Sequence, residues 1–456
     1  MEDIKLGGYI QVPYSQELRS LVYLKYLYTE TRSEESVTAV KIDKVNNIMY
    51  FPRNITKFAS AFPNIINYNV IDQRVSCKVP TKLELIEGFK PRYYQEEALT
   101  KIEDYHNRDI TDLILEAKAG SGKSYMMSAY IVALQERTLI LVDRSLLANQ
   151  MFEEISTNTT ASVQLLTKDT VEVADVNIAT FQLMSKNPQL IALTYKKVGS
   201  IIVDETHIVG AKTFLQTVQC YAAKYRIGLS ATPFRSDGLT NLIFDVMGHH
   251  KVYAHNPENL KVQIHKVHNS EVFIVSSVSR FKREKTEFLL QPSIVTKITE
   301  LLTYLLKKDR AVLLACDSIM VQKAYSAYLE NLGISTGIVN GSTTKKKREE
   351  ILAKFEKGEI DVLLAFSVLE KGISIKRLDT IVSLVSPTEG QIIQLVGRLR
   401  RDHPTKGLPL YIDMFFEGNF KRAQSIKEQT FNQLIYSDGD KVMNFRDFAT
   451  YKKKWL

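Results

Sequence analysis

The chain has few cysteines and no long apolar run. Its three cysteines, Cys77, Cys220 and Cys316, are far apart among 456 residues and lack the spacing of a metal site. We therefore expect buried thiols in a reducing compartment rather than disulfides. Since no apolar run is long enough to cross a bilayer and the first residues are too polar for a signal peptide, we also expect a cytoplasmic protein that does not contact membranes.

The composition is that of a large globular protein with a basic surface. Hydrophobic residues make up 45% of the chain and charged residues 24%, and the length suggests about three domains. The formal net charge is +9, which favours a polyanionic partner such as nucleic acid. Solvated surface lysines would give the same charge, so the charge alone leaves the partner open.

A glycine-rich segment follows the apolar run Leu113–Leu115 and precedes a helical pattern. It reads EAKAGSGKSYM from Glu116 to Met126, and Ala117 stands where the usual pattern begins with glycine. Glycines allow backbone N–H groups to face phosphate oxygens, lysine adds a point charge, and a serine hydroxyl can ligate Mg²⁺. The predicted nucleotide-binding residues are Ala119, Gly120, Ser121, Gly122, Lys123 and Ser124, beside the positive end of the following helix.

Two adjacent acids follow another predicted strand, Ile201–Val203. Asp204 and Glu205 would repel each other unless a cation or solvent shared the site. We expect the phosphate-binding segment on a neighbouring strand, with Asp204 on Mg²⁺ and Glu205 orienting and deprotonating a water molecule. An exposed acidic turn is the alternative. Because both motifs follow buried strands in this order, ATP hydrolysis is the better interpretation.

Arginines suited to the γ-phosphate occur late in the chain. Gln394, Gly397, Arg398 and Arg401 form the pattern Q-x-x-G-R-x-x-R, with the two arginines about one helical turn apart. Guanidinium groups match phosphate oxygens and can stabilise the transition state as arginine fingers, although surface arginines on a helix would look the same. If these arginines reach the ATP, the two lobes must close on it, and ATP hydrolysis is then coupled to movement of the lobes.

Two series of apolar strands alternate with helical segments after Gly88. The first comprises Leu113–Leu115, Thr138–Val142, Val176–Ala179, Ile201–Val203 and Ile227–Leu229, and the second Ala311–Ala315, Ile334–Ile338, Val362–Ala365, Thr380–Val385 and Leu408–Ile412. Such series predict parallel sheets covered on both faces, with ligands at the carboxyl ends of the strands. We expect an α/β protein with one lobe over 88–255, a linker with a basic segment over 256–291, and a second lobe over 292–456.

Residues 1–87 have a more irregular pattern. Short β-prone pieces, Gly8–Val12, Ala39–Ile42 and Ile48–Phe51, surround a helical stretch near Gln16–Tyr28. Tyrosines alternate there with lysines and arginines, which suits base stacking and phosphate contact. Tyrosines at helical spacing can equally form a core face. We expect a small α+β accessory domain.

The ordered motifs resemble those of a superfamily 2 helicase. They are PRYYQ, AKAGSGKS, LVDRSLLANQ, IATFQ, DETH, GLSATPFR, VNGST, FSVLEKGIS and QLVGRLRR, spread over roughly Phe89–Asp413. Within that superfamily, the small N-terminal domain, the compact linker and the SVLEKGISI form are most similar to phage branch-migrating DNA helicases of the UvsW kind, and more distantly to RecG and XPB-like motors. The resemblance implies two RecA-like lobes in tandem and an N-terminal domain that recognises DNA.

The resemblance also implies roles for individual residues. Gln95 would read the adenine edge, with Arg92 or Tyr93 packed nearby. His207, with Ser230 and Thr232 of SATP, would link the nucleotide to the contact between the lobes. Nucleic-acid backbone would be held by Arg144, Gln150, Thr180 and Gln182 on the first lobe and by Asn340, Gly341, Thr344 and Ser367 on the second. Short polar side chains and backbone donors suit phosphate contacts that carry no sequence information.

Two positions depart from the family pattern. Ser374 stands where the family often has aspartate, which leaves open the link from that loop to the nucleotide, and Thr206 in DETH argues against a DEAD-box RNA helicase. We expect a monomeric or weakly associating, ATP- and Mg²⁺-dependent DNA helicase that remodels forks or Holliday-type junctions in recombination, repair or replication. The alternatives are an RNA helicase, a duplex translocase that does not separate strands, and a nucleic-acid-binding module with a vestigial ATPase.

Overall fold

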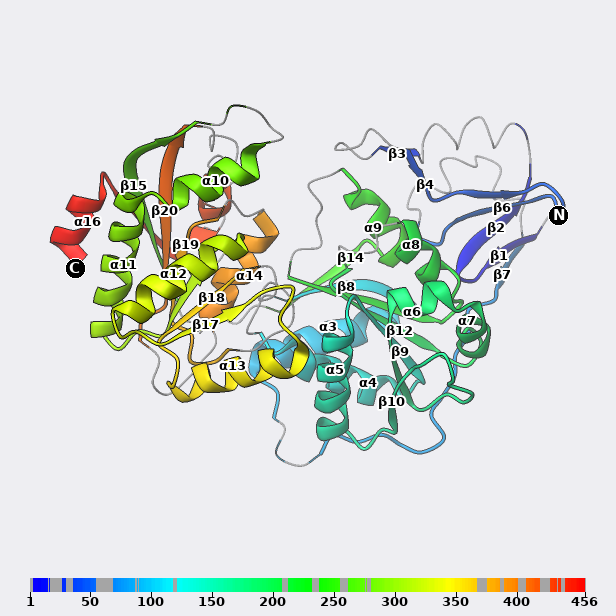
Figure 1. The fold of residues 1–456 in the computed structure, drawn as a ribbon. Helices are drawn as coiled ribbons and strands as arrows, with labels where there is room; N and C mark the ends of the chain where they lie inside the picture. Colours follow the sequence, from blue (N-terminus) through cyan, green and yellow to red (C-terminus); the bar gives the residue numbers. More distant parts are fainter. Residues whose placement is uncertain are drawn as a thin grey trace. The chain divides into compact units, whose positions relative to one another are not determined.

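The protein forms two compact units, Met1–His255 and Asn256–Leu456, in a computed structural model (Figure 1). The structure describes residues 3–14, 16, 27–29, 36–54, 69–86, 88, 90–117, 121–206, 212–231, 238–254, 261–274, 276, 280–366, 375–385, 389–400, 407–418, 427–432, 434–435 and 439–455. Two parallel-sheet lobes, one in each unit, and a small N-terminal sheet confirm the predicted fold class.

The N-terminal sheet has the strand order β5-β6-β2-β1-β7. Its strands are β1 (Asp3–Leu6), β2 (Tyr9–Pro13), β5 (Lys41–Asp43), β6 (Ile48–Pro52) and β7 (Asn69–Asp72), and β3 (Leu27–Thr29) pairs separately with β4 (Ser36–Thr38). Alternate residues of β2 and β6, such as Val12 and Phe51, are buried in a common core. The predicted helix Gln16–Tyr28 lies largely outside the described residues, and its last positions are in β3 instead.

The first lobe is built on a seven-stranded parallel sheet with the order β10-β11-β9-β12-β13-β8-β14. The strands are β8 (Asp112–Ala117), β9 (Thr138–Val142), β10 (Val163–Leu165), β11 (Val176–Thr180), β12 (Ser200–Asp204), β13 (Tyr225–Ser230) and β14 (His250–Ala254). The helices are α3 (Tyr93–Asn107), α4 (Lys123–Leu134), α5 (Ser145–Asn158), α6 (Phe181–Lys186), α7 (Pro188–Thr194), α8 (Lys212–Gln219) and α9 (Thr240–Met247).

Both faces of this sheet are covered by helices, which explains its uninterrupted apolar strands. Leu113 and Leu115 of β8 pack with residues of α3, α4 and α5, whereas Ile114 between them packs with residues of α6, α8 and α9. Because successive side chains of a strand point to opposite faces, every position of β8 must then be apolar. All five strands predicted for this lobe are present, and β10 and β14 are the two edge strands that the sequence pattern did not reveal.

The second lobe contains another seven-stranded parallel sheet, with the order β17-β18-β16-β19-β20-β15-β21. The strands are β15 (Gln263–Phe273), β16 (Val312–Ala315), β17 (Thr336–Val339), β18 (Val362–Ala365), β19 (Thr380–Ser383), β20 (Leu410–Gly418) and β21 (Lys441–Phe445). The helices are α10 (Phe281–Leu289), α11 (Pro292–Lys307), α12 (Ile319–Asn331), α13 (Lys345–Lys357), α14 (Glu389–Leu399) and α16 (Phe448–Trp455).

The structure differs from the predicted linker over 256–291. Strand β15 lies inside the second sheet, between β20 and β21, and α10 contributes Phe288 and Leu289 to the core of the same lobe. The polar residues of β15 made this segment look like a linker. Their polar groups have partners within the lobe: Lys266 Nζ lies 2.9 Å from Glu428 Oε1, and Asn269 Nδ2 donates to the Phe415 carbonyl at 3.2 Å.

The N-terminal sheet is fixed to the first lobe by the buried Arg53. The guanidinium of Arg53 forms a bidentate ion pair with Asp112 at the start of β8, and its Nη1 also donates to the Ala223 carbonyl at 2.7 Å. Arg226, which is fully buried, donates to the carbonyls of Val246 and Tyr221 at 2.7 and 3.0 Å. Arg53 Nη1 also donates to the Gly7 carbonyl of the N-terminal sheet at 3.3 Å, so this guanidinium bonds carbonyls on both sides of the contact, whereas the bonds of Arg226 lie within the first lobe.

The three cysteines are free thiols, but only Cys316 is buried. Cys77 is partly exposed and Cys220 is exposed, so the expectation of buried thiols is wrong for Cys220. Burial raises the pKa of the Cys316 thiol far above its usual range. Across the described ranges, every helix is too short or too polar to span a lipid bilayer.

Candidate active site

The phosphate-binding segment ends at Gly122, immediately before helix α4. Gly122 has a left-handed backbone with φ of +75°, and a Cβ atom there would lie 2.3 Å from Gln95 Nε2. Glycine is therefore required both by the backbone conformation and by the close approach of a neighbouring side chain. Lys123 and Ser124 follow as the first residues of α4, and the unbonded N–H groups at a helix start are suited to bind an anion. Ala119 and Gly120 lie outside the described residues.

Helix α3 reaches this segment through Gln95. The buried Gln95 donates from Nε2 to the Ser121 carbonyl at 2.8 Å, and its Oε1 accepts from the Arg92 N–H at 2.9 Å. Tyr94 adds a second donor to the same carbonyl, at 3.1 Å. Both ends of the Gln95 amide are thus engaged within the protein, so Gln95 positions the phosphate-binding segment in addition to any contact with a base. The resemblance did not indicate Tyr94.

The two acids lie at the carboxyl end of β12. Asp204 is its last residue and is 6% exposed, and Glu205 follows with a left-handed φ of +56°. Lys123 Nζ lies 4.0 Å from Glu205 Oε1, so the structure brings the two predicted catalytic groups together. Non-glycine residues in this conformation are uncommon and cluster at functional sites.

The expected placement of these motifs on neighbouring strands is wrong. Strand β13 lies between β12 and β8, and its last residue, Ser230, is in register with Glu116 of β8. Sequence spacing cannot reveal this order, because a parallel sheet is free to insert a later strand between two earlier ones. Ser230 of the SATP motif therefore ends its strand between the two motifs. Thr206 fills the space next to Gly228 and donates to the Leu229 carbonyl at 3.0 Å.

The oxygen donors of this site fit Mg²⁺ held together with phosphate. Mg²⁺ commonly takes one or two protein oxygens and completes its shell with water and substrate phosphates. Ser124 and Asp204 offer a hydroxyl and a carboxylate of that kind. In the part of the chain that the structure describes, no cluster of three or more histidine, cysteine or acidic side chains could hold a metal by itself.

The predicted nucleic-acid contacts of the first lobe lie at the carboxyl ends of adjacent strands. Asp143 follows β9, and its carboxylate accepts from Arg144 Nε at 3.3 Å and from Gln182 Nε2 at 3.2 Å. Thr180 caps α6 by accepting from the Leu183 N–H at 3.2 Å. The carboxyl ends of β9 and β11 therefore bring together Arg144, Thr180 and Gln182. Gln150 is half-buried on α5.

Of the residues predicted to contact nucleic acid on the second lobe, Asn340, Gly341 and Thr344 lie just before α13. Asn340 Oδ1 accepts from the backbone N–H and the hydroxyl of Ser342, at 3.0 and 2.7 Å, which shapes the turn after β17. Thr344 is the exposed N-cap of α13, and Gly341 is exposed with open space around it. Exposed backbone donors at a helix start suit a phosphate group.

The arginine motif of the second lobe lies on α14. Gln394 is half-buried there, and Arg398 is 4% exposed. Arg400, to which the sequence analysis gave no role, is also buried and forms an ion pair with Asp440, whose other oxygen accepts from the Val262 N–H at 2.9 Å. Arg401, His207, Thr232, Ser367 and Ser374 lie outside the described residues.

Two sequence families match the two lobes. The family described as "Type III restriction enzyme, res subunit" matches residues 88–235, and the "Helicase conserved C-terminal domain" matches residues 293–403. The chain carries the two domains of a superfamily 2 helicase. The first match contains the Lys123 and Glu205 site of this helicase, and the second contains Asn340 and Arg398.

Individual relatives are distant in sequence. The "Probable helicase D10" of Escherichia phage T5 is 24% identical over 77% of this helicase and 76% of the relative. The "DNA 3'-5' helicase XPB" of Mycobacterium tuberculosis is 25% identical over 68% of the chain and 59% of the relative. Among solved structures, "S. cerevisiae Dbp5 bound to RNA and ADP BeF3" has a TM-score of 0.54 at 16% identity, covering 80% of this chain and 96% of that one. This last similarity supports the fold of the helicase.

Proposed function

We propose that the protein is an ATP-dependent DNA helicase or translocase that remodels branched DNA, such as forks and four-way junctions. The observation that carries the ATPase part is the meeting of Lys123 and Glu205, 4.0 Å apart at the carboxyl edge of the first sheet. The choice of branched DNA rests on the resemblance of the motifs, and the DNA helicase names among the relatives favour DNA.

Each residue of the ATP site has a distinct task in this proposal. Lys123 and the N–H groups at the start of α4 bind the outer phosphates, which replace Glu205 as the partner of the Lys123 ammonium. Ser124 and Asp204 would hold Mg²⁺, which neutralises charge on the β- and γ-phosphates. Once the Lys123 ammonium faces phosphate, the Glu205 carboxylate is available to orient the attacking water and accept its proton.

The second lobe would complete this site. Arg398, with Arg401, would place a guanidinium on the charge that develops at the γ-phosphate, so efficient hydrolysis would require the two lobes to close. The two groups of nucleic-acid contacts would then change their separation once in each ATP cycle. Gln182 on one lobe and Thr344 on the other would grip the phosphate backbone without reading sequence. Alternate gripping and release would move the protein along DNA.

The decisive experiment compares nucleic-acid structures as activators. ATPase and strand separation would be measured on a four-way DNA junction, a forked DNA duplex, a blunt DNA duplex and a matched RNA duplex. We expect junctions and forks to stimulate most. Glu205→Gln should bind ATP and DNA but lose roughly 10²- to 10⁴-fold in turnover, because it removes the general base while keeping the shape.

Glu97→Gln provides the matched control. Glu97 is exposed on α3, so this substitution makes the same chemical change away from the site. If the RNA duplex stimulates most, the protein is an RNA helicase and the assignment of DNA as the substrate is wrong. Displacement of a bound block without strand release would indicate a duplex translocase. If the unmodified protein binds DNA but does not hydrolyse ATP, it is a nucleic-acid-binding module with a vestigial ATPase, and the ATPase assignment is wrong.

A further inference from the structure

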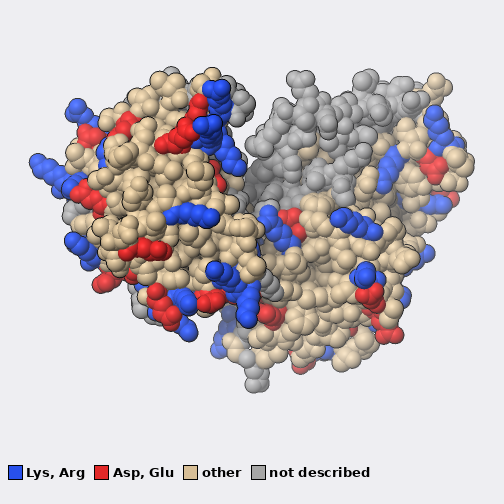
Figure 2. All heavy atoms as spheres, viewed as in Figure 1, with Lys and Arg blue, Asp and Glu red and all other residues tan. Residues whose placement is uncertain are grey.

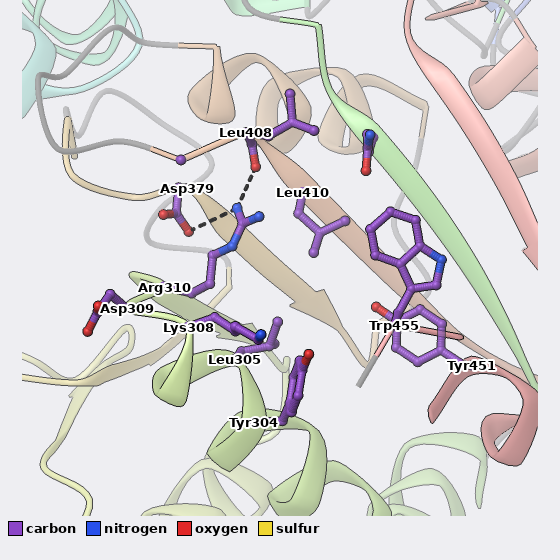
Figure 3. Close-up of a pocket in the computed structure, with 12 residues that line it drawn as sticks. Tyr304, Leu305, Lys308, Asp309, Arg310, Asp379, Leu408, Leu410, Tyr451 and Trp455 are labelled. Carbon is purple, nitrogen blue, oxygen red and sulfur yellow. Dashed lines mark hydrogen bonds and ion pairs between the residues drawn. The ribbon is translucent and has the colours of Figure 1, made fainter. Parts of the chain in front are cut away.

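The two edges of the second sheet use their polar side chains differently. At the amino-terminal edge lies a cavity of about 550 Å³ that Trp455, Arg310 and Asp379 help to line (Figure 3). Arg310 donates to the Leu408 carbonyl and lies 3.8 Å from Asp379, so these groups satisfy one another within the wall. At the carboxyl edge, buried polar side chains lead instead to the turn after β17, where the proposed nucleic-acid contacts of this lobe begin.

Gln322 is buried on α12 and joins the ends of two strands. It is 3% exposed, and its Nε2 donates at 2.9 Å to the carbonyl of Cys316, the residue just after β16. Its Oε1 accepts at 3.3 Å from Nδ2 of Asn340, the residue just after β17. Asn340 Oδ1 in turn accepts from the Ser342 N–H at 3.0 Å. Cys316, Gln322, Asn340 and Ser342 thus form a continuous series of hydrogen bonds, the amide relay, although β18 separates β16 from β17 in the sheet.

The polarity of the amide relay is fixed at both ends. The Cys316 carbonyl can only accept a hydrogen bond, so Gln322 must turn its NH₂ group towards it and its oxygen towards Asn340. The Ser342 N–H can only donate, so Asn340 must turn its oxygen towards the turn and its NH₂ group towards Gln322. Both positions need a neutral side chain that donates and accepts at once, which an amide provides. Since buried polar groups are costly to leave unpaired, the relay favours one conformation of the turn.

The Asn340 side chain is engaged in shaping this turn. Its Oδ1 also accepts from the Ser342 hydroxyl at 2.7 Å, and its backbone N–H donates to the Thr343 hydroxyl at 3.0 Å. Gly341 and Thr344, by contrast, are exposed. The turn therefore holds Asn340 on its inner side and presents Gly341 and Thr344 on its outer side.

We propose that Gln322 is a positioning residue for the nucleic-acid contacts of the second lobe. Through Asn340 it holds the turn so that the backbone at Gly341 and the Thr344 hydroxyl can meet a phosphate group without first having to be ordered. The inference rests on the proposed function, which places nucleic acid at this turn. It adds a buried residue of α12 to the binding machinery and gives Asn340 the task of support in place of contact.

Gln322→Met tests the amide, because methionine keeps the length and the unbranched shape of glutamine. Binding of a fluorescein-labelled forked DNA duplex to the full-length protein would be followed by fluorescence anisotropy without ATP. We expect the affinity to fall about tenfold, as for the loss of one hydrogen bond to a charged group. The slope of log affinity against log salt should stay the same, because the lost contact involves neutral donors and no cation.

Two variants serve as matched controls. Gln263→Met makes the same chemical change at the amino-terminal edge, where Gln263 lines the cavity of Figure 3, and should keep the affinity. Ser326→Ala removes a buried hydroxyl from the same helix as Gln322, and the partner of that hydroxyl, Thr336, begins β17 at the amino-terminal edge. Ser326→Ala should lower the resistance of the protein to urea but leave the affinity for DNA unchanged.

A double-mutant cycle separates support from contact. Asn340→Ala breaks the amide relay from the side of the turn and should also weaken binding about tenfold. The variant with both Gln322→Met and Asn340→Ala should bind no more than about twofold more weakly than either single variant, since both substitutions remove one interaction. Gln322→Leu takes the place of Gln322→Met in this cycle if the methionine variant does not fold.

Three results would overturn the proposal: unchanged affinity in Gln322→Met, single effects that multiply in the double variant, or a salt slope reduced by about 1, which would assign the loss to a displaced cation. If the unmodified protein does not bind the fork, the proposed function fails together with this inference. If the unmodified protein binds the fork and Gln322→Met binds it equally well, the proposed function stands and only the role of Gln322 is wrong.

Discussion

The backbone of Glu205 is the most unusual feature of the candidate active site. A left-handed conformation costs a non-glycine residue roughly 1–2 kcal/mol, so the surroundings must hold it in place. Asp204 is paired into the sheet before it, and Thr206 is fixed after it by the hydrogen bond to the Leu229 carbonyl. These two anchors direct the Glu205 carboxylate towards Lys123. Thr206 is thus a positioning residue for the proposed general base.

Thr206→Val should therefore lower the ATPase turnover number more than the affinity for ATP. The substitution keeps the volume but removes the hydroxyl, which leaves the Leu229 carbonyl without that donor and costs about 1 kcal/mol of stability. Steady-state kinetics and urea-induced unfolding measure the two effects. Thr206→Ser, which keeps the donor, should retain most of the turnover. Equal turnover in both variants would contradict the positioning role.

A second residue-scale prediction concerns His265 in the core of the second lobe. Burial, with a smaller contribution from Arg310, lowers its pKa from 6.5 to about 4, because the charged imidazolium is poorly accommodated. The unfolded chain therefore binds a proton first as the pH falls. Stability is complete above about pH 6.5 and decreases down to pH 4, by up to about 3 kcal/mol.

Urea-induced unfolding at pH 7 and pH 5 tests the role of His265. His265→Phe should reduce the loss of stability between these pH values, since it removes the titrating group from an aromatic environment formed by Phe445, Tyr451 and Trp455. His250→Gln is the matched control at an exposed position and should retain the full pH dependence. An unchanged pH dependence in His265→Phe would rule out this account.

At the scale of elements, the N-terminal sheet is joined to the first lobe by a buried ion pair. Arg53 lies two residues after Phe51 of β6, Asp112 begins β8, and the side chains are 2% and 6% exposed. The connecting segment also runs along the lobe, where Val75 pairs with Ala223 in a parallel bridge. The N-terminal sheet and the first lobe are therefore rigidly connected, and a force on one is transmitted to the other.

Arg53→Ala should destabilise the protein by about 3–5 kcal/mol, since it leaves the Asp112 carboxylate buried without its cation. The double variant Arg53→Met with Asp112→Leu should recover much of this loss because neither charge of the pair stays buried without its partner. Thermal or urea-induced unfolding measures both. Lys82→Ala, which removes an exposed partner of Glu84, should cost less than about 1 kcal/mol. A small effect of Arg53→Ala would show that the sheet does not depend on this pair.

At the scale of the whole molecule, we expect nucleic-acid binding to depend on where the cationic side chains lie relative to the two sheets, and less on the total net charge. Figure 2 shows lysine and arginine side chains interspersed with acidic ones over the face in view, so the net charge of +9 does not form one continuous patch there. The proposed backbone contacts gather instead at the carboxyl ends of strands. A phosphate contact should therefore be lost only when a cation at that edge is removed.

Arg144→Gln should weaken binding to different DNA sequences about equally and reduce the slope of log affinity against log salt by about 1. Arg108→Gln is the matched control, because Arg108 lies before β8, at the opposite edge of the same sheet, and is similarly exposed. Fluorescence anisotropy at several salt concentrations gives both slopes. Equal changes in the two variants would indicate a diffuse electrostatic effect instead of a contact at the carboxyl edge.

The fold class and most of the sheet strands could be predicted from local patterns. Continuous apolar runs mark strands that are buried on both faces, and each polar motif follows such a run, so the motifs were expected at carboxyl edges. The strand β15 was missed because His265, Lys266 and Asn269 look solvated until their partners on other elements are known. Edge strands such as β14 carry mixed residues and give a weak pattern for the same reason.

The sequence by itself determined which chemical groups are available: a phosphate-binding lysine, two adjacent acids, paired arginines and a single tryptophan. These follow from residue types and short spacings, which do not change on folding. Only the tertiary structure decided that β13 separates the two ATPase motifs, that Gln95 holds the Ser121 carbonyl, and that Trp455 lines a cavity beside Lys308. Each of these depends on contacts between residues far apart in the chain, and such contacts are set by packing rather than by local pattern.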